Sequence, residues 1–223
     1  MIVGSILLAF AIDALWEERQ DQIAELNTLE ALHDEFESNI RLFKSGDSLH
    51  LQLATDTQSL LNQMLEAPVN SVIEVDDSQW IPLVAFLTTE AATGTLNTLL
   101  SSGQIDLFKN QELQQALAYW PATLKNSYEN DVGVREFGLK QLIPGMVGHV
   151  DLSEILAAKT PAGLLSGNAF ALKGNAYELH INPTTLSLVG ELHLLRQMLL
   201  RGSRVRMERA ERILGLIEAQ IQL

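Results

Sequence analysis

The residue types that could bind a metal ion or act as acid and base are scattered in this sequence rather than gathered at fixed spacings. The five histidines are His33, His50, His149, His180 and His193. No two of them stand four apart, as the helical H-E-x-x-H zinc motif requires. His149 and Asp151 lie in a glycine-rich stretch and could share an ion, but two ligands do not make a site. The sequence therefore predicts no metal ion and no cofactor.

Patterns for nucleophilic and phosphate chemistry are also missing. The sequence has no G-x-S-x-G turn, no P-loop and no Rossmann glycine pattern. Ser101-Ser102-Gly103 resembles a nucleophile turn, but a helix end closed by glycine explains it better. The lack of cysteine excludes disulfides, thiolate nucleophiles and cysteine metal ligands. An enzyme of unrecognised type stays an alternative, although the sequence leans against one.

Charge is distributed unevenly along the chain. The 223 residues carry a net charge of −13, and residues 1–110 hold 17 acids against 4 bases. Residues 111–223 hold 11 acids and 11 bases. A protein that binds DNA or RNA needs surplus lysine and arginine opposite the phosphates. Nucleic acid is therefore not an expected partner.

The bases that do gather lie near the C-terminus, where residues 196–212 carry a net charge of +4. The arginines predicted to contact an acidic partner or anionic lipid headgroups are Arg201, Arg204, Arg206, Arg209 and Arg212. The preferred interpretation, however, is that they pair with the acidic first helix. Both interpretations need a long last helix, and Asn182-Pro183 is a strong signal for its start.

The first element is also a long helix. Residues 2–12 are uncharged, and after Asp13 the apolar run continues to Trp16 before a dense acidic stretch. This order is typical of a membrane helix leaving the bilayer, so Asp13 and Trp16 are predicted to lie at the membrane interface. Sixteen helical residues span only about 24 Å, whereas the hydrocarbon core is about 30 Å thick.

Three interpretations of residues 1–16 are open. The anchor is cut because the sequence starts too late, the run is a buried or interfacial helix, or it is a signal peptide with Ala9-Phe10-Ala11 as its cleavage site. The first is preferred. It predicts a single-pass protein of a bacterial membrane, held to lipid by its N-terminal helix and partnered by itself or another membrane protein. The acidic exit flank favours an extracytoplasmic domain.

The first helix continues beyond the acidic stretch with heptad spacing. The predicted seam consists of Leu26, Leu29, His33, Phe36, Ile40 and Phe43. Steps of three and four place such residues on one face, which needs a partner helix. Gly46 should end this helix. The seam is short, so a bundle within the chain is preferred over a long coiled coil.

The remaining pattern completes an all-α prediction. Further helices are expected over residues 47–66, 80–89, 95–102, 110–143 and 182–220, with Pro121 kinking or restarting the fourth. A strand at residues 72–75 finds no partner, and residues 145–181 form an irregular insert. The predicted fold is an N-terminal membrane-anchor helix (1–16) continuing into an antiparallel helical bundle (17–223) with long first and last helices.

Two functions are compatible with this fold. The leading interpretation is a membrane-anchored module that binds another protein or assembles with itself, because the seam and the anchor are present and catalytic motifs are not. The first alternative is a sensor that binds a small ligand around Trp80, Phe86, Trp120 and Tyr128. Ordinary core packing is the preferred explanation of the same aromatic residues.

Two segments resemble an uncharacterised bacterial family of single-pass, membrane-anchored helical proteins. They are SILLAFAIDALWEERQ at 5–20 and TLNTLLSSGQIDLFKNQELQQALAYW at 95–120. In that family an apolar helix ends in a tryptophan followed by Glu-Glu-Arg, and a Leu-x-Ser-x-Gly turn leads into a helix opened by asparagine. The resemblance implies a single-pass anchor and an all-helical domain of unknown function. It implies no activity and no functional residues.

Overall fold

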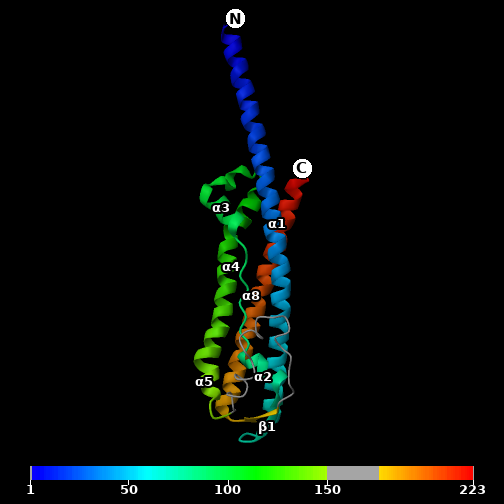
Figure 1. The fold of residues 1–223 in the computed structure, drawn as a ribbon, viewed down its shortest axis with the longest axis vertical. Helices are drawn as coiled ribbons and strands as arrows, with labels where there is room; N and C mark the ends of the chain where they lie inside the picture. Colours follow the sequence, from blue (N-terminus) through cyan, green and yellow to red (C-terminus); the bar gives the residue numbers. More distant parts are fainter. Residues whose placement is uncertain (1, 150–175, 223) are drawn as a thin grey trace. The chain divides into compact units, whose positions relative to one another are not determined.

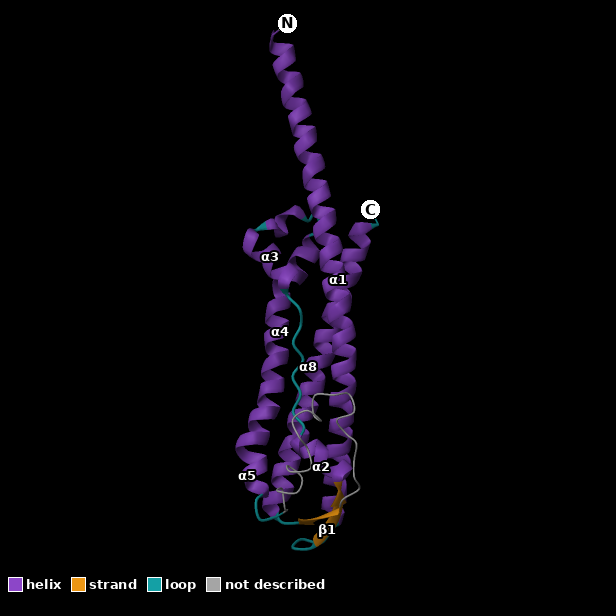
Figure 2. Ribbon diagram, viewed as in Figure 1, coloured by secondary structure: helices purple, strands orange, loops and turns teal. Residues whose placement is uncertain are grey.

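The computed structural model describes residues 2–149 and 176–222, and most of these residues are helical (Figure 2). Figure 1 labels most of the elements. In chain order they are α1 (Ile2–Glu66), β1 (Val72–Asp76), α2 (Asp77–Val84), α3 (Gly94–Ser102), the 3-10 turn η1 (Gln104–Leu107), α4 (Gln111–Phe137), the π-helical turn η2 (Gly138–Leu142), α5 (Ile143–Met146), β2 (Ala176–His180) and α8 (Pro183–Ile221). The predicted helical class and the long first and last helices are confirmed.

Two compact units make up the chain. Unit 1 consists of residues 1–43, 91–124 and 205–223, and unit 2 of residues 44–90 and 125–204. The helices α1, α4 and α8 each begin in one unit and end in the other. Each unit has its own principal apolar cluster, so each can be understood from its own residues.

The core of unit 1 is built on the predicted seam of α1. Leu29, Phe36, Ile40 and Phe43 are buried there together with Leu32. They pack against apolar residues of α3, α4 and α8. The first and third seam positions behave differently: Leu26 is exposed, and His33 is half-buried. The heptad spacing therefore predicted most of the packing face correctly.

Several helix ends are also as predicted. Asn110 Oδ1 accepts the Glu112 N–H at 2.9 Å before α4, and Asn182 Oδ1 accepts the Thr184 N–H at 2.9 Å before α8. Gly103 closes α3 with a φ of 72°, a left-handed conformation that glycine adopts without steric cost. Each cap provides partners for backbone groups that the helix itself cannot pair.

The predicted helix break at Gly46 is wrong, since α1 is continuous to Glu66. A glycine inside a helix costs only about 1 kcal/mol relative to alanine, which packing on both sides can offset. Gly46 has a different role. A Cβ at this position would lie 2.6 Å from Thr89 Oγ1, so the glycine lets the extended segment before α3 approach the helix.

Pro121 does not restart the fourth helix either, because α4 is continuous from Gln111 to Phe137. Leu117 and Trp120 are buried before the proline and Thr123 is buried after it. This packing holds both sides of the helix in place and offsets the cost of the lost hydrogen bond, about 3 kcal/mol.

Part of the predicted insert at residues 145–181 is a strand. Residues 176–180 form β2, which pairs antiparallel with β1 and aligns Val72 with His180 and Asp76 with Ala176. The described part of the chain is thus mostly helical with one small two-stranded sheet. The expected strand at residues 72–75 had no visible partner because its partner follows more than 100 residues later. Residues 150–175 of the predicted insert lie outside the described residues.

The predicted single-pass membrane location is wrong. No helix in the described part of the chain combines the length and the apolar character that crossing a bilayer requires. The physical reason lies in the charges of α1, because Asp13 interrupts the apolar run and Glu17, Glu18 and Arg19 follow within two turns. The membrane-anchored part of the predicted fold loses its basis with it.

One buried cation links the last helix of unit 2 to the end of α2. Arg196 donates hydrogen bonds to the backbone carbonyls of Pro82 and, at 3.1 Å, Ala85. A short helix leaves its last carbonyls without helical partners, and the guanidinium satisfies them. Burial lowers the pKa of Arg196 to about 10, against the opposing effect of Asp56.

We expect Arg196→Met to lower the free energy of unfolding by about 2–4 kcal/mol, because it leaves buried carbonyl oxygens unpaired. Arg201→Met, an exposed site on the same helix, should change it by no more than about 0.5 kcal/mol. Urea unfolding followed by circular dichroism measures both. Equal effects of the two substitutions would contradict this role for Arg196.

In unit 1, α1 holds the segment that leads into α3. Asn39 pairs with both backbone groups of Ala92, donating to its carbonyl at 2.7 Å and accepting its N–H at 2.8 Å. Glu35 accepts the N–H groups of Thr95 at 2.7 Å and Leu96 at 3.3 Å. Thr93, the residue that precedes α3, provides no side-chain cap, so the carboxylate of α1 replaces it.

Removing this cap with Glu35→Ala should cost about 1–2 kcal/mol of stability and speed hydrogen exchange at the Thr95 and Leu96 amides. The control is Glu30→Ala, which removes an exposed carboxylate from the same helix. Amide exchange measured by NMR distinguishes the two. Unchanged exchange at the start of α3 in Glu35→Ala would show that the carboxylate is not its cap.

Candidate functional site

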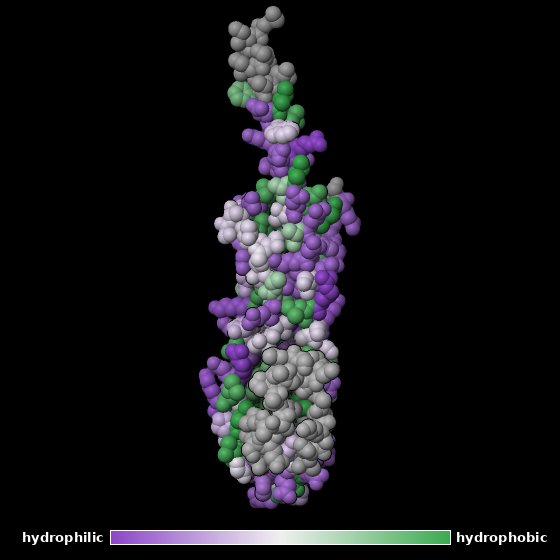
Figure 3. Space-filling model, in the orientation of Figure 1, coloured by the Kyte–Doolittle hydropathy of each residue, from purple (hydrophilic) through white to green (hydrophobic). Residues whose placement is uncertain are grey.

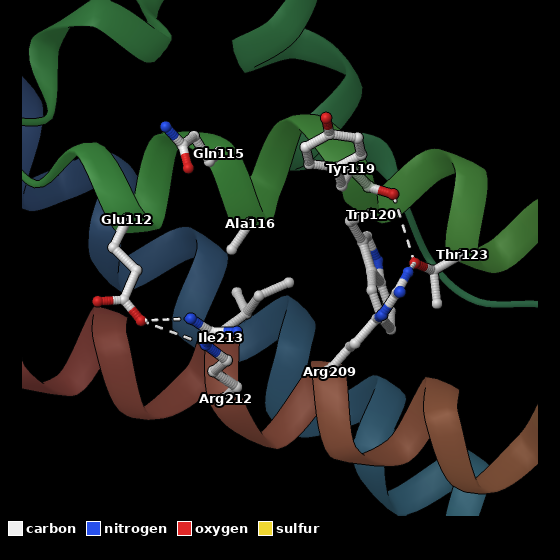
Figure 4. Close-up of a pocket in the computed structure, with 9 residues that line it drawn as sticks. All are labelled: Glu112, Gln115, Ala116, Tyr119, Trp120, Thr123, Arg209, Arg212 and Ile213. Atoms are coloured by element: carbon white, nitrogen blue, oxygen red, sulfur yellow. Dashed lines mark hydrogen bonds and ion pairs between the residues drawn. The ribbon is translucent and has the colours of Figure 1, made fainter.

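A hollow of about 320 Å³ lies between α4 and α8 within unit 1 (Figure 4). Residues of both helices line it: Glu112, Gln115, Ala116, Tyr119, Trp120, Thr123, Arg209, Arg212 and Ile213. Ligand sites in proteins usually have volumes of roughly 300–1,000 Å³, so this one suits a small molecule.

The floor of the hollow is apolar and rigid. Trp120 is only 1 % exposed, and its ring centroid lies 5.2 Å from that of Phe36 and 6.2 Å from that of Phe43. Ile213 is buried in the same cluster, and Ala116 packs against it. The small side chain of Ala116 leaves room above this floor, as Figure 4 shows.

One end of the hollow carries an ion pair. Arg212 donates from Nη2 to Glu112 Oε1 at 2.7 Å and from Nε to the same oxygen at 3.2 Å. Both side chains are more than half exposed. The pair fixes these two groups at the rim and neutralises the charge of Arg212.

At the other end, Arg209 extends from α8 toward α4 (Figure 4). Its Nη1 donates to Thr123 Oγ1 at 2.6 Å, and the Thr123 hydroxyl donates weakly to the Tyr119 carbonyl at 3.4 Å. Within the described residues, no carboxylate forms an ion pair with Arg209. Its charge is therefore held beside a neutral hydroxyl rather than beside an anion.

The five predicted contact arginines do not form one surface. Arg201 and Arg204 are exposed in unit 2, whereas Arg206 in unit 1 is buried with its guanidinium 4.2 Å from the Phe43 ring centroid. Arg209 and Arg212 line the hollow. The surroundings of each position therefore differ, although four of the five arginines lie within about 140° of one another on α8.

The preferred prediction, pairing with the acidic first helix, is wrong for two of them. Arg212 pairs with Glu112 and Arg209 with Thr123, and both partners belong to α4. Asp13 and Trp16 of α1 are exposed, and the interface role predicted for them lost its basis with the membrane location.

The four aromatic residues considered for a ligand pocket do not meet in one. Trp80 is buried in the core of unit 2, where it packs edge-on against Tyr177 with the two ring centroids 6.4 Å apart. Trp120 is buried in the core of unit 1. Tyr128 is exposed. Of these aromatic residues only Trp120 reaches the hollow, and it forms the floor.

Metal-binding groups do not converge in the part of the chain that the structure describes, where no three histidine or acidic side chains could share an ion. His149 lies near Asn182, at 3.4 Å from Nδ1 to Nδ2, and Asp151 lies outside the described residues.

The residues of the hollow were mostly missed in the sequence. Gln115, Ala116, Tyr119 and Thr123 belong to no motif, and they become neighbours only when α4 and α8 pack. The available signal was the pair of arginines three apart, Arg209 and Arg212, on a helix with an apolar face.

Comparison with known proteins gives no relative: the chain matches no protein-family model, no curated protein and no solved structure. The resemblance to an uncharacterised bacterial family therefore stays a prediction.

The energetics of the hollow can be divided between rim and floor. A double-mutant cycle with Glu112→Ala and Arg212→Ala should give a coupling of only about 0.2–1 kcal/mol, because the pair is exposed. Trp120→Ala should cost about 3–5 kcal/mol, because it empties the core beneath. Chemical denaturation measures both free energies. A coupling energy between Glu112 and Arg212 larger than the stability lost in Trp120→Ala would contradict this division between rim and floor.

Proposed function

We propose that this protein is a helical interaction module that assembles with a second copy of itself through an exposed face of α1. The observation that carries the proposal is an apolar stripe on this helix, which we call the α1 stripe. It consists of Ile12, Leu15, Trp16, Ile23 and Leu26, all exposed.

The stripe belongs to a stretch of helix that other elements do not cover. Every residue from 10 to 23 is exposed, and Figure 3 shows hydrophobic and hydrophilic side chains side by side along it. The side chain of Trp16 is 64 % exposed. Contiguous exposed apolar surface of this kind marks interaction sites in folded proteins.

The geometry of the helix separates the α1 stripe from the acidic residues, while Phe10, which is also exposed, lies outside the stripe on the acidic side. At about 100° per residue, the α1 stripe occupies one arc of about 100°. The acids of the same stretch fall in a separate arc on the other side; they are Asp13, Glu17, Glu18, Asp21 and Glu25. The centre of the buried face formed by residues 29–43 lies about 110° from the centre of the stripe, although Leu29 and Ile40 lie within about 40° of Leu15. The neighbours that cover the seam therefore leave most of the stripe open.

The charge pattern favours a second copy as the occupant. The chain carries a net charge of −13, and two such chains would repel if their acids met. Pairing stripe to stripe turns the acidic arcs away from each other, so the repulsion is screened by solvent. A single apolar stripe is also self-complementary, as a two-fold interface requires.

Arg19 is the exception within the stripe. It lies in the middle of the apolar arc. In a pair of helices its aliphatic stem would lie at the dimer interface, and its guanidinium would extend toward solvent. A polar residue at such a position lowers the stability of helix pairing while restricting its register. The stripe spans about 21 Å, so we expect a weak dimer with a dissociation constant on the order of 10 µM.

The scaffold behind the stripe is proposed to be an antiparallel bundle in unit 1. Arg209 contacts Thr123 and Arg212 contacts Glu112, so the contact order along α8 is opposite to that along α4. The contact order is also opposite along α1 and α8: Phe43 contacts Arg206, and His33 Nε2 lies 3.7 Å from Glu218 Oε1. This packing anchors α1 and leaves its first turns free to bind.

Analytical ultracentrifugation tests the proposal. Trp16→Glu should weaken the dimer at least about tenfold, because it places a charge in the apolar arc, whereas Arg19→Leu should strengthen it. The control Glu17→Gln removes a charge from the acidic arc and should not weaken dimerisation. A monomer at all concentrations, or equal effects at positions 16 and 17, would contradict it.

Cross-linking of the cysteine-free chain locates the interface independently. We expect an antiparallel pair centred on Arg19, in which Leu15 of one copy faces Ile23 of the other. A mixture of Leu15→Cys and Ile23→Cys chains should then form disulfide dimers on oxidation. A mixture of Glu17→Cys and Asp21→Cys chains, which has the same register on the acidic arc, should not. Dimers that cross-link equally through both faces would place the interface elsewhere.

A further inference from the structure

The hollow between α4 and α8 has features that self-assembly through α1 does not use. Its lining holds one carboxylate and two guanidinium groups, so one positive charge is in excess. Glu112 already neutralises Arg212. The excess charge therefore belongs to Arg209, at the end where the buried Thr123 hydroxyl fixes it.

The hydrogen-bonding capacity of Arg209 is mostly unused. A guanidinium has five N–H donors in a planar fork, and within the described residues only the bond to Thr123 uses one. The fork is already held in place, so a ligand that binds it loses little side-chain entropy. A carboxylate matches this geometry because its two oxygens can accept two parallel N–H bonds.

The rest of the hollow suits an apolar part of a ligand. Trp120, Ala116 and Ile213 form the floor, and the largely exposed ring of Tyr119 stands at the rim, as drawn in Figure 4. A volume of about 320 Å³ accommodates one ring but not a large ligand. The carboxylate of Glu112 would repel a doubly charged phosphate group more strongly than a singly charged carboxylate.

We infer that this hollow is a binding site for a small organic carboxylate with an aromatic or aliphatic ring, whose carboxylate binds Arg209 and whose ring fills the space beside Ala116 and Tyr119. The carboxylate can come from a free small acid or from the C-terminus of a peptide that ends in an aromatic residue. The small volume favours the free acid.

Ligand titrations on the full chain test this inference by ¹⁵N-HSQC NMR. Benzoate should bind with a dissociation constant on the order of 1 mM, as expected for a ligand of so few atoms. Benzamide has the same shape without the charge and should bind at least about tenfold more weakly. Inorganic phosphate should give no saturable shifts in the amides of α4 and α8 that surround the hollow.

Variants separate the two halves of the site. Arg209→Gln removes the charge and should weaken benzoate binding about tenfold or more while leaving benzamide unaffected. Ala116→Leu keeps Arg209 but fills the space above the floor, and it should abolish both. Arg201→Gln, an exposed arginine elsewhere on α8, is the matched control and should bind benzoate like the unchanged chain.

The outcomes are distinct. Benzoate binding that survives Arg209→Gln, or benzamide binding as strong as benzoate, would overturn the inference. If Arg209→Gln does not fold, as judged by its circular dichroism, Ala116→Leu decides on its own. A short peptide ending in phenylalanine, compared with its C-terminal amide, distinguishes the sources: tighter binding of the peptide acid than of benzoate would assign the site to a chain terminus.

Discussion

A helix of 65 residues has far more apolar side chains than it can shield alone, and this constraint determines unit 1. From Leu29 to Phe43, α1 buries one face against α3, α4 and α8. Trp120 contacts Phe36 and Phe43 and so joins the first helix to the fourth. Phe36 and Phe43 belong to the seam, and Trp120 is the floor of the hollow. The start of α3 is held by Glu35 of the same first helix.

Polar groups define how the helices end and approach one another, while apolar burial brings them together. Glu35 and Asn39 hold the segment before α3 by its backbone, and Arg196 satisfies carbonyls at the end of α2. Both contacts join residues far apart in the chain, and both satisfy backbone groups that burial would otherwise leave unpaired. Such contacts contribute specificity, since an apolar face alone tolerates several arrangements.

Sequence patterns predicted what depends on near neighbours. Helix caps at Asn110 and Asn182, the glycine end at Gly103 and most of the seam follow from spacing over a few residues. Features that depend on distant contacts were missed. From sequence alone Gly46 predicts a helix break, whereas its packing against Thr89 explains the glycine within a continuous helix. The strand at residues 72–75 pairs with residues 176–180, far away in the sequence.

The arginines near the C-terminus show why composition predicts a site less well than a fold. Their density suggested one basic surface, yet neighbours on other elements give each a different environment: Arg206 packs on Phe43, Arg212 pairs with Glu112 and, in the part of the chain that the structure describes, Arg209 binds only a hydroxyl. The same charge is thus buried, neutralised or available according to its neighbours on other elements. What makes Arg209 a candidate for binding is the neutral partner that fixes it and the apolar floor beside it, and both are properties of the packed helices.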